Sequence, residues 1–302
     1  MKKKALKIIA LIIAVALIIG ICWAANGLNG NPISKWLAKR GANNYLKEHF
    51  PNTDYYIEEL GFSFKFTGYY AHVRSKTSMD TQFTLEIDML GNVYFDTYES
   101  VTGGFVTARR VEQEYRELTD QIFENPAFPY PSDIGYGTLE IYPREALDDP
   151  NVNDIPDYAL VQQDLVLDQI YDIRELGRQA GHLIIYVESD TISFELASQI
   201  MLGIRTEFDK ANIPFRTMDF VLQLPLPEEG PRSDEEVRVE DFRYEDIYQE
   251  NLIARIKAAH EELEAYYAEQ EHLQQEFPCS ARCFSRGSKP PDRQCCIQLQ
   301  IG

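Results

Sequence analysis

FTLEIDMLGNVYFDTY, residues 83–98, is the stretch that decides the fold of the first half of the chain. Phe83, Leu85 and Ile87 alternate with polar residues, which is the period of a strand with one buried face and one face in water. Gly91-Asn92 then separates this strand from a second one, as in a two-residue β-hairpin. A sheet that is apolar on one side needs a cover, and we predict that a helix supplies it.

The neighbouring segments extend this pattern. GFSFKFTG (61–68) alternates in the same way, and residues 55–98 hold eleven Phe and Tyr. We interpret these aromatic residues as a sheet face packed beneath a helix, with an aromatic ligand cradle as the alternative. The covering helix is predicted from PISKWLAKRGANNYLKEHFP (32–51), which has one proline in its first turn and another at its end. FVTARRVEQEYRELTDQIFEN (105–125) is a further amphipathic helix.

A second pattern begins after NPAFPYPSD (125–133), whose three prolines mark the predicted domain boundary. HLIIYVE (182–188) and RTMDFVLQL (216–224) are predicted strands, and residues 193–212 between them form a predicted helix capped by Ser193. This alternation of strand and helix predicts a small α/β sheet. The sequence also predicts a strand at 137–143, a helix over 164–181, a proline-rich loop over 225–236 and a long helix over about 241–277.

The N-terminus has the features of a membrane segment. Four lysines precede an uncharged apolar run over residues 8–25, long enough for a helix of roughly 27 Å that crosses a bilayer core. The excess of basic residues before the run predicts a cytoplasmic N-terminus and an extracytoplasmic body. We expect an uncleaved anchor. A cleaved signal peptide, for which Ala24 offers a weak site, and a lipoprotein, disfavoured by Ile21 before Cys22, remain alternatives.

Composition excludes some partners. The net charge is −19 at pH 7, and both ends of the chain are basic, so the body between them is more acidic still. Because an acidic surface repels nucleic acid, we exclude nucleic acid as a partner. No cysteine lies between Trp23 and Phe277, so this body has neither disulfides nor thiolate metal sites.

The segment 278–302 changes character, with four cysteines and a positive charge. A zinc-binding tail, a disulfide-stapled tail and a disordered or non-native extension are the alternatives, and we favour the last because the apolar periodicity stops.

One loop has the spacing of oxygen ligands. DDPNVNDIPD (148–157) places Asp149, Asn151 and Asn153 at alternate positions, as calcium loops do, and Asp157 adds a fourth ligand. The pattern departs from an EF-hand, because the glycine of the sharp turn and the closing bidentate glutamate are missing. We name these four residues as a candidate calcium site, with a solvated turn as the alternative.

Sequence motifs of catalysis are absent. The five histidines show no H-E-x-x-H spacing, and GFSFK around Ser63 lacks the second glycine of a nucleophile elbow. GYGTLE (135–140) lacks the third glycine of a dinucleotide fingerprint. We therefore predict no catalytic residue and no organic cofactor, and favour a binding protein over an enzyme.

Two regions resemble a known family. NPISKWLAKRGANNYLKEHFP with the aromatic segment after it, and GHLIIYVESD with PFRTMDFVLQLP, look like the YfjL-like group of bacterial single-pass membrane proteins. The resemblance extends over approximately residues 1–270 and brings no catalytic motif. It implies a two-domain, membrane-tethered protein of Gram-positive bacteria.

The sequence thus predicts an α+β protein with an N-terminal transmembrane helix, a helix-covered antiparallel β-meander and a second small α/β sheet domain that ends in a long helix. Its parts are an anchor (1–29, with the span at 8–25), the meander domain (30–125), the βαβαβ-like domain (126–277) and the tail (278–302).

We expect a membrane-anchored extracytoplasmic protein that binds, senses or assists in the cell envelope and has a protein partner there. A carboxylate-based envelope hydrolase, with or without calcium, is one alternative. A chaperone- or inhibitor-like module, whose meander edge takes an extended peptide, is the other.

Overall fold

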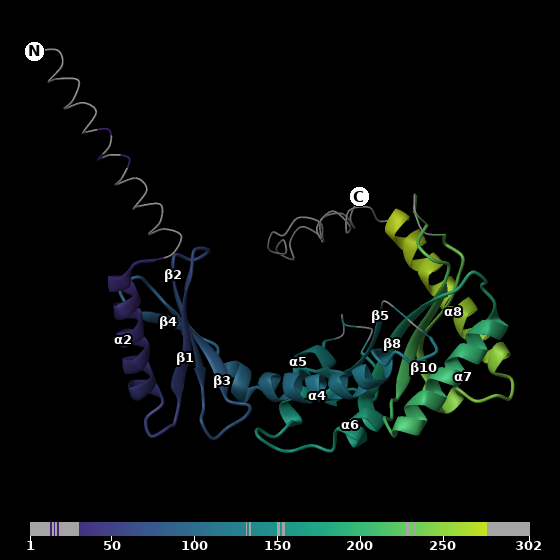
Figure 1. Cartoon of the computed structure of the whole chain (residues 1–302), viewed down its shortest axis with the longest axis horizontal. Helices are drawn as coiled ribbons and strands as arrows, with labels where there is room; N and C mark the ends of the chain where they lie inside the picture. Colours follow the sequence, from purple (N-terminus) through teal and green to yellow (C-terminus); the bar gives the residue numbers. More distant parts are fainter. Residues whose placement is uncertain are drawn as a thin grey trace, which may run out of the picture. The chain divides into compact units, whose positions relative to one another are not determined.

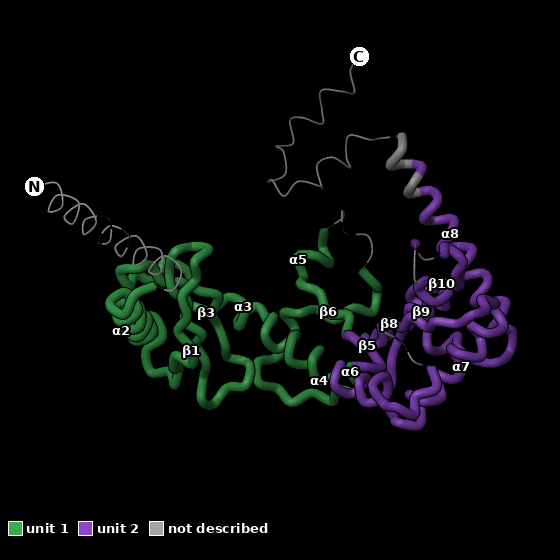
Figure 2. Tube along the Cα trace, turned by 45° about the horizontal axis from the view of Figure 1, so that its top comes forward, with its two compact units in different colours: residues 1–115, 139–176 green, residues 116–138, 177–302 purple. Residues whose placement is uncertain are grey.

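The computed structural model describes residues 13, 15, 17, 30–130, 132, 134–149, 152, 155–227, 230, 231 and 233–276. These residues form two compact units, shown in two colours in Figure 2. Unit 1 comprises residues 1–115 and 139–176, and unit 2 comprises residues 116–138 and 177–302. Each unit contains a four-stranded sheet with antiparallel strands and has helices beside it, so the fold is α+β (Figure 1). The domain boundaries expected at 29/30, 125/126 and 277/278 stay predictions.

Unit 1 is built on an antiparallel meander in the order β1-β2-β3-β4. Helix α2 covers one face of it, above buried side chains of β2 and β3 (Figure 1). This is the helix-covered meander that the alternating pattern predicted, but the strand predicted over 61–68 is wrong in its second half. β1 ends at Ser63, residues 64–67 form a turn, and Phe64 and Phe66 are exposed instead of packed beneath the helix. The elements are α2 (Pro32–His49), β1 (Tyr56–Ser63), β2 (Gly68–Arg74), β3 (Gln82–Ile87) and β4 (Val93–Asp96). They are followed by α3 (Glu99–Thr102), α4 (Phe105–Phe123), β6 (Ile141–Tyr142), α5 (Arg144–Leu147), β7 (Leu160–Val161), the 3₁₀ turn η1 (Gln162–Asp164) and α6 (Ile173–Ala180).

Helix α2 can approach the sheet closely because its inner face carries small residues. Ser34, Ala38 and Ala42 recur every fourth position and are buried. A Cβ atom on Gly41 would lie 1.8 Å from the carbonyl oxygen of Gly91, so the helix and the β3–β4 loop touch backbone to backbone. Only glycine fits at position 41.

The β3–β4 connection is longer than the two-residue hairpin that Gly91-Asn92 predicted, and that prediction is wrong. β3 ends at Ile87 and β4 begins at Val93. The carboxylate of Asp88 accepts the backbone N–H groups of Leu90 at 2.9 Å and Asn92 at 2.8 Å. An Asx-type side chain therefore organises this loop, in place of the primed turn that a two-residue hairpin uses.

A buried carboxylate joins three segments of unit 1. Asp80, fully buried after β2, accepts hydrogen bonds from Nε of Arg110 at 2.6 Å and from the hydroxyl of Thr107 at 2.9 Å, both on α4. It also accepts the backbone N–H of Asp168 at 2.8 Å. A buried charge needs such partners, since an unpaired one is costly in a low-dielectric interior.

The contact with Asp80 also explains why the helix predicted over 164–181 is wrong in its first half. Residues 165–172 contain no helix, and α6 begins at Ile173. Asp168 has a left-handed backbone with φ of 61°, and its N–H bonds the distant Asp80 instead of a preceding carbonyl. An α-helix does not run through such a residue.

Unit 2 is built on a sheet in the order β10-β9-β8-β5. β8 and β9 are parallel and are connected through α7, whereas β10 is antiparallel to β9. Buried residues of α7 and of the three strands form the core, and α7 lies beside the sheet in Figure 1. The elements are β5 (Ile134–Leu139), β8 (Gly181–Glu188), α7 (Phe194–Ala211), β9 (Thr217–Gln223), β10 (Glu236–Arg243), the 3₁₀ turn η2 (Tyr244–Asp246) and α8 (Leu252–Glu276).

Strand β10 was not predicted, and the long helix begins later than expected. The sequence predicts a loop over 225–236 and a helix from about 241, whereas β10 begins at Glu236 and α8 begins at Leu252. Val237 and Val239 alternate with charged residues and are buried, which is the strand signal. Helix α8 lies along the edge of β10, where His260 Nδ1 is 3.2 Å from the backbone nitrogen of Arg238 and 3.1 Å from its carbonyl oxygen.

The membrane prediction falls almost wholly outside the described part of the chain. Of residues 8–25 only 13, 15 and 17 are described, and residues 278–302 are not described at all. Among the described residues, no helix is long and apolar enough to cross a bilayer.

Substituting Asp80→Asn should destabilise the protein by about 3 kcal/mol, because Arg110 would keep a buried guanidinium beside a neutral amide. Removing one partner of a buried ion pair usually costs about 3–5 kcal/mol. We expect the lower end of this range, since Glu114 stays paired with Arg110 at 2.8 Å. Urea unfolding followed by circular dichroism measures the change. Asp164→Asn is the matched control, because it breaks an exposed ion pair with Arg144 and should cost less than about 1 kcal/mol. If the two substitutions lower the free energy of unfolding equally, the stabilising role assigned to the buried Asp80 carboxylate is wrong.

The same carboxylate predicts a pH dependence. Burial by itself would raise the pKa of Asp80, but the hydrogen bonds from Arg110, Asp168 and Thr107 outweigh burial and lower this pKa below 3.8. The stability that a depressed pKa contributes is complete above the unfolded-state value and is lost as the pH falls through the folded-state value. The free energy of unfolding should therefore decline below about pH 4, and this decline should be weaker in Asp80→Asn.

Candidate functional site

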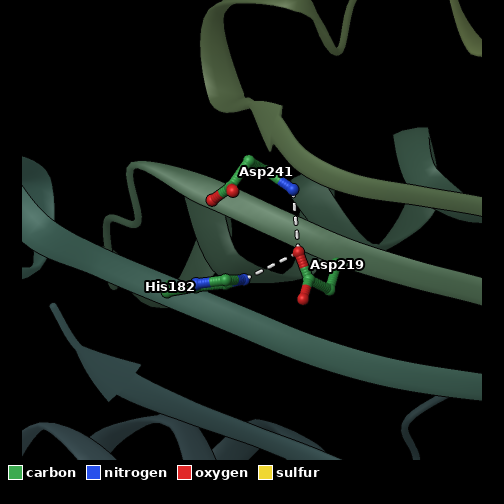
Figure 3. Close-up of side chains that lie close together, drawn as sticks. All are labelled: His182, Asp219 and Asp241. Atoms are coloured by element: carbon green, nitrogen blue, oxygen red, sulfur yellow. Dashed lines mark hydrogen bonds and ion pairs between the residues drawn. The ribbon is translucent and has the colours of Figure 1, made fainter. Parts of the chain in front are cut away.

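Three strands of unit 2 bring His182, Asp219 and Asp241 together, as Figure 3 shows. His182 is the second residue of β8, and Asp219 is the third residue of β9. The parallel register pairs His182 with Thr217 and Ile184 with Asp219. Because alternate residues share a face of a sheet, His182 and Asp219 project on the same side. We call these three residues the His–Asp–Asp cluster.

Asp241 reaches the cluster through a β-bulge. The pairing of β10 with β9 is regular as far as Val239, opposite Phe220, and resumes at Phe242, opposite Met218. Asp241 lies inside this bulge and has a left-handed backbone with φ of 49°, a conformation that Asp tolerates better than most residues with side chains. Bulges re-aim side chains and are frequent beside functional sites.

Asp219 lies at the centre of the cluster. Its Oδ1 is 2.9 Å from Nε2 of His182 and accepts the backbone N–H of Asp241 at 2.8 Å (Figure 3). One nitrogen of His182 and one carboxylate oxygen from each aspartate lie within 4.8 Å of one another. His182 is only 8% exposed, Asp219 is half-buried and Asp241 is exposed, so water reaches the cluster from the Asp241 side.

Two kinds of chemistry fit this geometry. The pair His182–Asp219 places an imidazole nitrogen 2.9 Å from a carboxylate oxygen. All three side chains together offer one nitrogen and two oxygens, a donor set that suits divalent transition metals. No local histidine motif in the sequence indicates this cluster, since its members stand on separate strands.

A second polar group joins β10 to α8. Arg238 and Glu240 form a close ion pair, and the hydroxyl of Tyr267 donates to Oε1 of Glu240 at 3.1 Å. The guanidinium of Arg238 lies 5.4 Å from the centre of the Tyr267 ring. Partial burial, together with the negative charge of Glu240, raises the pKa of Tyr267. These contacts hold the helix on the strand, and we assign them a structural role.

Unit 1 has a hollow of about 430 Å³ on the side of the meander away from α2. His72 and Arg74 of β2 line it, and alternation points both away from the buried face. Phe105, which is 46% exposed, and Arg109 line it from α4. Glu58 pairs with Arg74 at 3.0 Å. The hollow, which we call the unit 1 hollow, therefore combines an aromatic ring with three basic side chains in an acidic chain.

The predicted calcium site is only partly described. Asn151 and Asn153 lie outside the described residues, while Asp149 and Asp157 are exposed. The carbonyl oxygen of Asp149 accepts the backbone N–H of Val152 at 3.1 Å, as in a tight turn. Calcium binding by these four residues stays a prediction.

Comparison with known proteins gives two matches. Residues 3–97 match the YfjL-like N-terminal domain, and residues 114–257 match the YfjL-like C-terminal domain. Neither match reaches the cysteine-rich segment 278–302. No curated protein and no solved structure matches the chain.

Proposed function

The chain belongs to the YfjL-like family, and we propose that it is a membrane-anchored binding protein whose body lies outside the cytoplasm. The match to the N-terminal family domain begins at residue 3 and so includes the apolar run 8–25. In this proposal the run anchors the chain in the membrane, and the lysines before it keep the N-terminus in the cytoplasm.

The observation that supports binding best is the unit 1 hollow. A sheet face that is merely solvated needs neither a half-exposed Phe105 nor basic groups gathered around it. Arg109 attracts acidic groups, as does Arg74 beside its partner Glu58, while the ring offers apolar contact. The hollow therefore suits an acidic, partly apolar segment of a protein partner in the envelope. Arginine and aromatic residues are also the types most enriched at binding hot spots.

Cysteine labelling tests the anchoring. No native cysteine lies between Trp23 and Phe277, so a chain whose tail cysteines are replaced by serine reports cleanly on added ones. Glu262→Cys, exposed on α8, should react with a membrane-impermeant maleimide in intact cells. Lys4→Cys should react only after lysis, and the parent without either change measures the background from Cys22. Protection of position 262 in intact cells would refute the proposed topology.

Photo-crosslinking tests the binding surface. A photoreactive residue at position 105 should form one discrete adduct with an envelope protein in the cells of origin. The same residue at position 266 is the control, because Tyr266 is 47% exposed and Phe105 is 46% exposed. Arg109→Glu should abolish the adduct, because charge reversal repels an acidic segment.

Lys257→Glu, a reversal on exposed α8, should leave that adduct unchanged. The assignment of the hollow is wrong if position 266 gives the same adduct, or if both reversals have the same effect.

A further inference from the structure

We propose that the His–Asp–Asp cluster of unit 2 binds one divalent transition-metal ion, and zinc more tightly than manganese. The ligands would be Nε2 of His182 and one carboxylate oxygen each from Asp219 and Asp241. This inference uses residues of unit 2 alone and is independent of the unit 1 hollow.

The spacing of the donor atoms supports a shared ion. Ligand atoms at about 2.0–2.2 Å from a zinc ion lie roughly 3.3–3.6 Å from each other in a tetrahedral arrangement. Nε2 of His182 and Oδ1 of Asp219 are already 2.9 Å apart, and all three donors lie within 4.8 Å. Asp241 is exposed, so rotation of its side chain can bring its carboxylate closer without disturbing the core.

The charges of the cluster also favour a bound cation. With a neutral imidazole, the two carboxylates place two negative charges within a few ångströms on a part of the sheet where His182 is buried. A divalent cation offsets both charges. A metal-bound imidazole nitrogen carries no hydrogen, so Nε2 of His182 would bind the ion through its lone pair.

The backbone holds the ligands in place before an ion arrives. His182 and Asp219 stand on adjacent paired strands, β8 and β9. The N–H of Asp241 donates to Asp219 at 2.8 Å, an outer contact of the kind that orients a metal-binding carboxylate. Three protein ligands would leave a further coordination position for water or for an oxygen of a ligand.

The donor set selects the class of ion. Calcium takes six to eight oxygen ligands, whereas imidazole nitrogen with carboxylate suits zinc and its neighbours. Along the divalent first-row series, affinity for a given site rises from manganese to copper and then falls at zinc, which still binds more tightly than manganese. Zinc should therefore bind more tightly than manganese, and calcium should not bind at this cluster.

Isothermal titration calorimetry tests the proposal on the full chain, with its four tail cysteines changed to serine because thiolates would also take zinc. Zinc should bind at one ion per chain. His182→Gln can still donate a hydrogen bond to Asp219 but lacks the imidazole ligand. It should lower zinc affinity by more than the roughly 10–100-fold that loss of an outer contact costs. Asp241→Asn keeps the backbone N–H and tolerates the left-handed backbone, and should also weaken binding.

His49→Gln is the matched control, because His49 is exposed at the end of α2 in unit 1. Its zinc affinity should equal that of the parent. Urea unfolding without metal shows whether His182→Gln is folded, and if it is not, Asp241→Asn decides the question. Zinc affinity that is unchanged in both cluster variants, or lowered equally by His49→Gln, would overturn the proposal.

Discussion

One oxygen atom, Oδ1 of Asp219, constrains the arrangement of three strands in unit 2. It lies 2.9 Å from Nε2 of His182 on β8 and accepts the backbone N–H of Asp241 in the bulge of β10. A carboxylate on an inner strand needs such partners to offset its desolvation. Because both partners meet one acceptor, the bulge and the histidine are positioned together, and the geometry of the whole cluster follows from this contact.

In each unit a helix covers one face of the sheet, and other polar side chains of the strands form the candidate binding sites. In unit 1, small residues let α2 lie directly on the meander, and the opposite side carries the basic and aromatic lining of the hollow. In unit 2, α7 covers the core, and His182 and Asp219 stand together on β8 and β9. This arrangement suits a binding protein, because a well-packed sheet is a rigid scaffold for the side chains that contact a ligand.

Sequence periodicity predicted α2, α7, β8 and β9 because each follows a simple apolar repeat. It failed for residues 165–172, where a distant carboxylate, Asp80, fixes Asp168 in a left-handed conformation. It also missed β10, whose two valines stand among charges beside a proline-rich loop. The His–Asp–Asp cluster was beyond a search for local motifs, because strand register and a bulge assemble it. The calcium loop was inferred from local spacing and stays a prediction.

Nitrogen NMR of the histidine side chains tests the central claim most directly, since the chain has five histidines and each gives its own imidazole signals. The spectrum of His182 is identified by its loss in His182→Gln. On addition of one equivalent of zinc, Nε2 of His182 should move to a metal-bound shift, while the other four imidazoles keep their shifts. A shift at a different histidine, or none at His182, would contradict the account.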